Sequence, residues 1–137
     1  MPLFESTTHV AAPPDELFAF FLDPANRPYM SPPELGMIIL TGPNPLTVGS
    51  RLEFKVMGMG LVQQMLHEIT DLEPNVLMAE KQIKGPLTSF LHRHHFKVLP
   101  NGGTELRDEI EFAPPGGILG LLATEDKILD SFEDGFY

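Results

Sequence analysis

The 137-residue sequence contains no cysteine and no tryptophan, and only nine of its residues are lysine or arginine. Without cysteine, the chain has neither a disulfide scaffold nor a thiolate metal site. The formal net charge of −10 disfavours duplex nucleic acid and anionic membrane surfaces as partners, because both are bound through clusters of basic side chains. No apolar run approaches the roughly 20 residues of a membrane-spanning helix, so we expect no membrane insertion.

The N-terminal segment MPLFESTTHV also lacks the basic start and the apolar stretch of a signal peptide. A cytoplasmic location is therefore the default expectation. Apolar residues make up 42% of the chain and charged residues 20%, which is typical of a globular domain. The length suits one such domain, and no internal repeat or long linker divides it. We therefore predict a single domain over residues 1–137.

Alternation of apolar and polar residues predicts a series of β-strands connected by turns. It is clearest at 49–57, where Leu52, Phe54 and Val56 fall on one face and charged residues on the other. In the segment 61–71 apolar residues fall on both faces, so its inward face stays unassigned. The expected strands lie at about 3–10, 37–41, 49–57, 61–71, 76–84, 90–98 and 105–112.

Helical segments are expected after the first strand and at the end of the chain. Residues 12–22 begin with prolines and an early acid, which suit the first turn of a helix, and Asp23-Pro24 ends it. A further small helical turn is expected within 26–33. After residues 114–117, a closing helix is expected whose apolar stripe consists of Ile118, Leu121, Leu122, Ile128, Leu129, Phe132 and Phe136.

This order of elements, together with the segments Phe4–Asn26, Lys84–Phe96 and Gly102–Gly120, resembles the SRPBCC superfamily of START, birch-pollen-allergen-like and polyketide cyclase-like proteins. The resemblance implies an α+β helix-grip fold. In that fold a curved antiparallel sheet of about six or seven strands wraps around a long C-terminal helix, with one or two short helices after the first strand. It also implies an elongated cavity between the sheet and that helix. Members of the superfamily bind apolar molecules, assist cyclisation or dehydration of polyketides, or act as protein-interaction modules.

Three of the five histidines lie within the stretch SFLHRHHF at 89–96. Because side chains alternate along a strand, His92 and His94 share the face of two phenylalanines, which we predict to be the inward one. His95 points the other way, to solvent. In the last expected strand, Asp108 is the one acidic residue among apolar inward positions. A buried carboxylate is costly without a partner, so we expect Asp108 to have one.

The expected hairpin turns set the register of these residues. A three-residue loop at 101–103 places Phe96 opposite Asp108, and His94 opposite Ile110. Asp108 is then diagonal to His94 and within reach of its side chain.

The preceding turn brings further polar residues to the same face. A three-residue turn at 85–87 places Glu80 opposite His92, and Gln82 opposite Phe90.

Four interpretations of this polar group are open. In the first, the Asp and His side chains only satisfy each other's hydrogen bonds. In the second, the group recognises the polar end of a ligand. In the third, Asp108 orients His94 as a general acid or base. The fourth is a zinc site formed by two strand histidines and a carboxylate, but that spacing is common by chance. We therefore predict no metal ligand and no cofactor.

The favoured function is non-catalytic binding of a small, largely apolar molecule between the sheet and the C-terminal helix. The predicted ligand-binding residues are Glu80, Gln82, His92, His94, Asp108, Phe21, Phe54, Phe90, Leu121, Ile128 and Phe132. The alternative is a cyclase- or dehydratase-like enzyme that uses His94 and Asp108. A protein-interaction module is a third class, indicated only by the acidic residues Glu125, Asp126, Asp130, Glu133 and Asp134. The sequence is also compatible with a homodimer.

Overall fold

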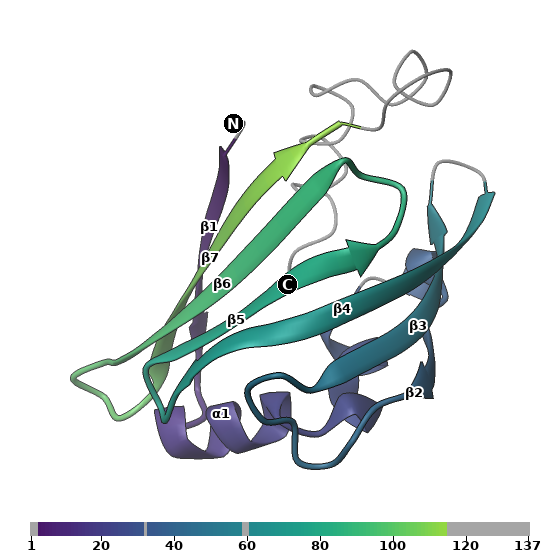
Figure 1. The fold of residues 1–137 in the computed structure, drawn as a ribbon. Helices are drawn as coiled ribbons and strands as arrows, with labels where there is room; N and C mark the ends of the chain where they lie inside the picture. Colours follow the sequence, from purple (N-terminus) through teal and green to yellow (C-terminus); the bar gives the residue numbers. More distant parts are fainter. Residues whose placement is uncertain (1–2, 32, 59–60, 115–137) are drawn as a thin grey trace.

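The computed structural model describes residues 3–31, 33–58 and 61–114 (Figure 1). In that part of the chain, seven strands form one curved sheet in the order β1-β7-β6-β5-β4-β3-β2, and every neighbouring pair is antiparallel. The strands are β1 Leu3–Val10, β2 Ile38–Thr41, β3 Arg51–Gly58, β4 Leu61–Glu73, β5 Leu77–Lys84, β6 Ser89–Val98 and β7 Thr104–Ala113. The predicted strands are thus confirmed, with small shifts at their ends.

Short helices follow β1, as predicted. Helix α1 spans Pro14–Phe21, with proline at its start and acidic residues in its first turn. The 3-10 helices η1 (Pro24–Met30) and η2 (Pro33–Leu35) follow it. Figure 1 shows α1 across one end of the sheet. No helix in the described part of the chain has the length and apolar character needed to cross a membrane.

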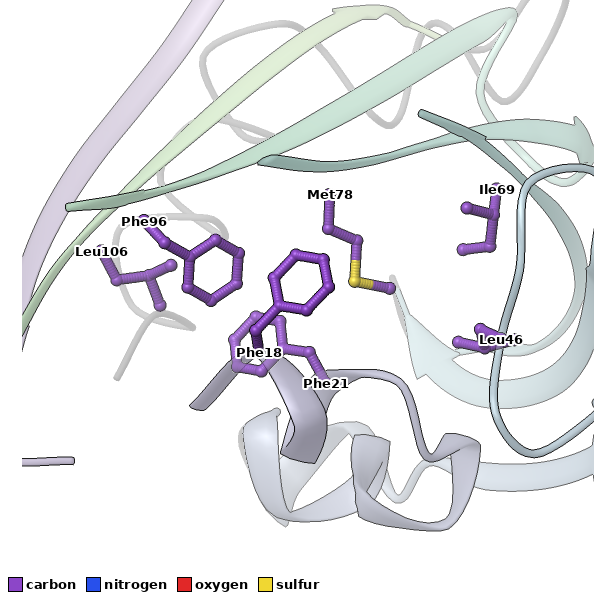
Figure 2. Close-up of a cluster of buried hydrophobic side chains, with 7 residues drawn as sticks. All are labelled: Phe18, Phe21, Leu46, Ile69, Met78, Phe96 and Leu106. Carbon is purple, nitrogen blue, oxygen red and sulfur yellow. The ribbon is translucent and has the colours of Figure 1, made fainter. Parts of the chain in front are cut away.

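One apolar core anchors α1 to the inner face of the sheet. Its buried residues are Phe18, Phe21, Leu46, Ile69, Met78, Phe96 and Leu106 (Figure 2). The rings of Phe18 and Phe21 meet the ring of Phe96 edge-on, with centroids 5.2 and 5.3 Å away. Such edge-to-face pairs stabilise the contact beyond the area that it buries. Two aromatic side chains therefore fix the short helix on β6.

A second apolar cluster lies further along the same face, where Phe4, Ile110 and Phe112 are buried and Leu87 and Phe90 pack against them. On β7 the even-numbered residues are buried from end to end. The predicted inward face of this strand is therefore confirmed. It runs from the first core through Asp108 to the second cluster.

The predicted register of the β6–β7 hairpin is wrong by two residues. His94 lies opposite Asp108 and His92 opposite Ile110, whereas Phe96 pairs with Leu106. Asp108 is therefore the direct cross-strand neighbour of His94 rather than a diagonal one.

The error arises because the hairpin loop has five residues, 99–103, instead of three. Leu99 N donates to Gly103 O at 2.8 Å, and Gly102 N donates to Leu99 O at 2.9 Å. Gly102 has a φ of 87°, in the region that favours glycine. Because three and five are both odd, the inward faces still match, and only the partners along them change.

The predicted pairing of Glu80 with His92 is confirmed. The β5–β6 ladder ends at Lys81 and Leu91, so Gln82 and Phe90, which were predicted to pair, lie beyond it.

The two-sided apolar pattern of β4 has a structural cause. The register between β4 and β5 shifts between Ile69 and Asp71. Before that shift His67 and Ile69 are buried, and after it Leu72 packs against the core, so the inward parity changes within the strand.

The predicted C-terminal helix lies outside the described residues, together with Leu121, Ile128, Phe132 and the late acidic residues.

Candidate functional site

A row of buried polar side chains crosses the inner face between the two apolar clusters. Four neighbouring strands supply five of its residues, and η1 supplies one more. Its members are Arg27 of η1, His67 of β4, Glu80 of β5, His92 and His94 of β6, and Asp108 of β7. The prediction that His92 and His94 face inward is therefore confirmed. Two residues of the row, Arg27 and His67, were not among the predicted site residues.

Asp108 is completely buried and contacts both histidines of β6 through one oxygen. His92 Nε2 hydrogen-bonds Asp108 Oδ1 at 2.8 Å. His94 Nδ1 lies 2.7 Å from the same oxygen, but its direction does not suit a hydrogen bond. Asp108 Oδ2 has no hydrogen-bond partner in the described part of the chain. The two imidazoles thus compete for one carboxylate oxygen, and the other oxygen is left over.

The electrostatics of this group favour an ionised aspartate beside a neutral His92. Burial alone would raise the pKa of Asp108, but the two histidines outweigh it and lower this pKa to about 2. Burial and the neighbouring His94 lower the pKa of His92 to about 4, against the opposing effect of Asp108. At neutral pH, His92 is therefore an uncharged donor to a carboxylate.

Aromatic rings enclose the histidines. The rings of His92 and His94 lie 3.9 Å apart at their centroids, tilted by 33°. Phe21 meets His94 edge-on at 5.1 Å, and Phe90 meets His92 edge-on at 6.0 Å. Phe54 likewise meets the remaining buried imidazole, His67, at 4.9 Å. All three predicted phenylalanines therefore contact a buried histidine.

Glu80 of β5 contacts two groups, the guanidinium of Arg27 and the imidazole of His67. Arg27 Nη1 donates to Glu80 Oε1 at 2.6 Å, and His67 Nδ1 lies 2.7 Å from Oε2 in a hydrogen bond. Burial works against ionisation, but Arg27 and His67 outweigh it and hold the pKa of Glu80 well below its usual value. Glu80 is therefore an ionised carboxylate with both oxygens engaged.

Arg27 gave little signal in the sequence. It lies in the turn-rich stretch 24–30, which has no apolar periodicity, and a lone arginine in such a stretch is ordinarily a surface residue. Only its contact with Glu80, 53 residues away along the chain, makes it part of the site.

Several buried polar atoms of this region have no hydrogen-bond partner among the residues that the structure describes. These atoms are Arg27 Nε and Nη2, His67 Nε2, Gln82 Oε1, His94 Nδ1 and Asp108 Oδ2. Gln82 is half-buried, and its Nε2 donates to Leu87 O at 2.6 Å. Such orphaned groups are few in native structures and each calls for an explanation.

His92, His94 and Asp108 are candidate metal ligands by residue type, and their ligand atoms all lie within 4.8 Å of one another. Ligand atoms around a tetrahedral zinc ion are about 3.3 Å apart, given the usual bond lengths. Asp108 Oδ1 instead lies 2.7 and 2.8 Å from the two imidazole nitrogens. The arrangement matches imidazole–carboxylate contacts better than a metal centre.

A surface hollow of about 280 Å³ occurs elsewhere, between residues of β3, β4 and the end of β5. Its lining consists of Glu53, Gln64, Met65, Leu66 and Lys84. None of the predicted site residues contributes to it.

Comparison with known families gives one match over nearly the whole chain. The model of the family described as polyketide cyclase/dehydrase and lipid transport matches residues 1–132. No curated protein matches the sequence significantly.

Several solved structures share the fold. The Zhui aromatase/cyclase from Streptomyces sp. R1128 is 23% identical, with a TM-score of 0.71 over 97% of this chain and 82% of that protein. A START superfamily protein from Mycobacterium smegmatis is 20% identical, with a TM-score of 0.66 over 96% and 94%. Major latex-like protein 151 from Panax ginseng is 16% identical, with a TM-score of 0.65 over 97% and 93%. At these identities the likeness concerns the fold.

Proposed function

Because the chain belongs to the polyketide cyclase/dehydrase and lipid transport family, within the SRPBCC superfamily, we propose that it binds a small, largely apolar molecule over the inner face of the sheet. The C-terminal segment would cover that molecule from the other side. The observation that carries the proposal is a group of buried polar atoms in the middle of an apolar face that have no hydrogen-bond partner among the described residues.

An unpaired buried donor or acceptor costs about 1–3 kcal/mol. The unpartnered atoms belong to five side chains that gather in one region, whereas the residues on either side of them form ordinary apolar cores. A bound molecule that offers matching polar atoms would remove this cost where it arises. Small-molecule sites have this composition, with apolar walls and a few convergent polar groups.

Each predicted residue has a place in this proposal. Glu80, Gln82, His92, His94 and Asp108 would form the polar end of the site. Phe21, Phe54 and Phe90 would form its apolar wall on the sheet side, and Leu121, Ile128 and Phe132 would form the opposite wall.

A second candidate is a cyclase- or dehydratase-like reaction, which the contact between His94 and Asp108 favours. An ionised Asp108 lies 2.7 Å from His94 Nδ1 and would stabilise an imidazolium that forms when His94 takes up a proton. The family description and the aromatase/cyclase among the structural neighbours support the same candidate.

Native mass spectrometry of the purified protein, combined with uptake of the neutral fluorescent probe N-phenylnaphthylamine, tests the binding proposal. We expect a bound organic mass or saturable probe uptake in the wild type. Replacing His94 with Ala should weaken uptake by about tenfold, in line with the loss of one buried polar contact. His95→Ala is the matched control, because His95 pairs with Glu109 on the opposite face.

Two results would contradict the proposal. One is a wild type that carries no organic mass and takes up no probe. The other is unchanged uptake and unchanged stability in both His92→Ala and His94→Ala. If His94→Ala instead binds normally but loses turnover of a polyketide-like substrate, the enzyme candidate is supported.

A further inference from the structure

Arg27 is the one buried lysine or arginine among the residues that the structure describes. Its guanidinium reaches the row of polar side chains from η1, and Nη1 donates to Glu80 Oε1 at 2.6 Å. Among the described residues its Nε and Nη2 have no hydrogen-bond partner, although its side chain is only 10% exposed. These two nitrogens carry three of the five N–H donors of the guanidinium, and a buried group with so many unused donors calls for a ligand of matching chemistry.

The unused donors form one complete edge of the guanidinium. The group is planar, and the N–H of Nε and one N–H of Nη2 point in the same direction from that edge. Two parallel donors of this kind match the two oxygens of a carboxylate in a bidentate pair. Glu80 takes Nη1 and leaves this edge free.

Neighbouring contacts hold the guanidinium in this orientation. Glu80 is 3% exposed, and its second oxygen is bound by His67 Nδ1 at 2.7 Å. The His67 ring is in turn packed between Phe54 and Phe90, with centroids 4.9 and 5.3 Å away. Because these partners are buried, they hold the guanidinium of Arg27 in one orientation in the ligand-free protein. Less conformational entropy is then lost when a ligand binds.

We propose that the free Nε and Nη2 edge of Arg27 binds a carboxylate carried by an otherwise apolar molecule. This inference rests on the proposed binding function and adds the chemical class of the ligand, an apolar organic acid. A preference for an acid over a neutral molecule would not come from the overall charge of the protein, because the net charge of −10 repels anions. It would have to come from Arg27. A carboxylate can accept from both Nε and Nη2, whereas a neutral carbonyl group would use only one of these two donors.

Competition between matched acids and alcohols tests the inference. Decanoate is compared with decanol, and naphthoate with naphthalenemethanol, each by its displacement of bound N-phenylnaphthylamine at neutral pH. At least one acid should bind about tenfold more tightly than its alcohol, as expected for a charge-assisted bidentate pair.

Arg27→Lys is the informative variant, because lysine keeps the positive charge beside Glu80 but lacks the two-donor edge. It should lose the preference for the acid, so that an acid and its matched alcohol displace the probe from this variant at similar concentrations. Arg51→Lys is the control, since Arg51 pairs with Glu68 at the surface. It should keep the full preference.

A spectroscopic signal separates recognition from a purely structural role of Arg27. In protein with nitrogen-15-labelled arginine, one buried Nε–H resonance should shift on addition of the preferred acid and stay in place with its alcohol. The wild-type measurements remain decisive even if Arg27→Lys fails to fold.

The outcomes distinguish this inference from the function on which it rests. If the probe binds but the alcohols compete as well as the acids, the carboxylate site is overturned and the binding function stands. An unchanged acid preference in Arg27→Lys also overturns it. If neither the probe nor any acid binds, both are overturned.

Discussion

Asp108 lies in an environment that is unfavourable for a charged side chain. It is fully buried, ionised at neutral pH, and contacts His92 and His94 through a single oxygen. Replacing a residue of this kind removes the partner of two other buried groups, which usually costs more than the pair itself contributes to stability.

Asp108→Ala should lower the free energy of unfolding by on the order of 3 kcal/mol, because it leaves two buried imidazoles without their carboxylate. Urea denaturation monitored by circular dichroism measures this loss. Asp71→Ala is a matched control at an exposed position and should change stability by less than about 0.5 kcal/mol. A loss below about 1 kcal/mol in Asp108→Ala would show that the histidines have other partners.

His92 predicts a dependence of stability on pH. Its pKa is about 4 in the folded protein, against 6.5 for an ordinary histidine. Between these values the unfolded chain binds a proton that the folded protein does not, so stability falls as the pH falls from 6.5 towards 4. The loss from this group reaches about 3 kcal/mol. Asp108 adds a further loss at lower pH, between 3.8 and about 2.

Urea denaturation at a series of pH values checks this profile. His92→Gln removes the titrating group, so its stability, although lower at neutral pH, should fall less steeply between pH 6.5 and 4. His9→Gln changes an exposed histidine and should keep the wild-type slope. Equal slopes in His92→Gln and the wild type would assign the acid sensitivity to another group.

At the scale of elements, the β6–β7 hairpin decides which residues of the site meet. Its five-residue loop aligns His94 with Asp108, and β1 pairs with the other edge of β7 up to Val10 and Thr104. The loop of this hairpin therefore turns close to the end of β1. Gly103 lies at that point, where an added Cβ atom would be 2.7 Å from Val10 O.

Gly103→Ala should lower the free energy of unfolding by about 2 kcal/mol, because the new methyl group meets a backbone oxygen that cannot turn away. Gly102→Ala is the comparison. There the Cβ meets open space, but φ is 87°, so we expect a smaller loss of about 1 kcal/mol from backbone strain. Thermal unfolding of both variants measures the order, and a larger loss in Gly102→Ala would show that backbone strain dominates this turn.

At the scale of the whole molecule, the inner face of the sheet has three zones. An apolar core anchors α1 at one end, a second apolar cluster gathers around Ile110 and Phe112, and the polar row lies between them. The folded protein thus tolerates orphaned polar atoms in its interior. A ligand that satisfies these atoms binds only the folded state and should therefore stabilise it.

A saturating ligand should raise the stability of the whole domain. For a ligand at one hundred times its dissociation constant, the free energy of unfolding should rise by about 2.7 kcal/mol. Thermal unfolding with increasing N-phenylnaphthylamine, or with the preferred acid, measures this shift. A melting temperature that does not depend on ligand concentration would contradict binding to the folded state.

The sequence by itself determined the features that depend on local patterns. Alternation and turn residues gave the strands, and alternation gave the inward faces of β6 and β7 and the placement of His92, His94 and Asp108 on one buried surface. The fold class followed from the resemblance to the SRPBCC superfamily, which rests on the order of these elements and on three sequence segments. Such features are readable because a side chain two positions further along a strand returns to the same face, whatever the rest of the chain does.

Only the tertiary structure decided which polar groups touch. The length of the 99–103 loop selected His94 as the neighbour of Asp108, and the packing of β4 beside β5 brought His67 to Glu80. Arg27 reached Glu80 from a 3-10 helix 53 residues away. Contacts of this kind depend on the loops and on the packing of distant elements, which leave no periodic signal in the residues that they join.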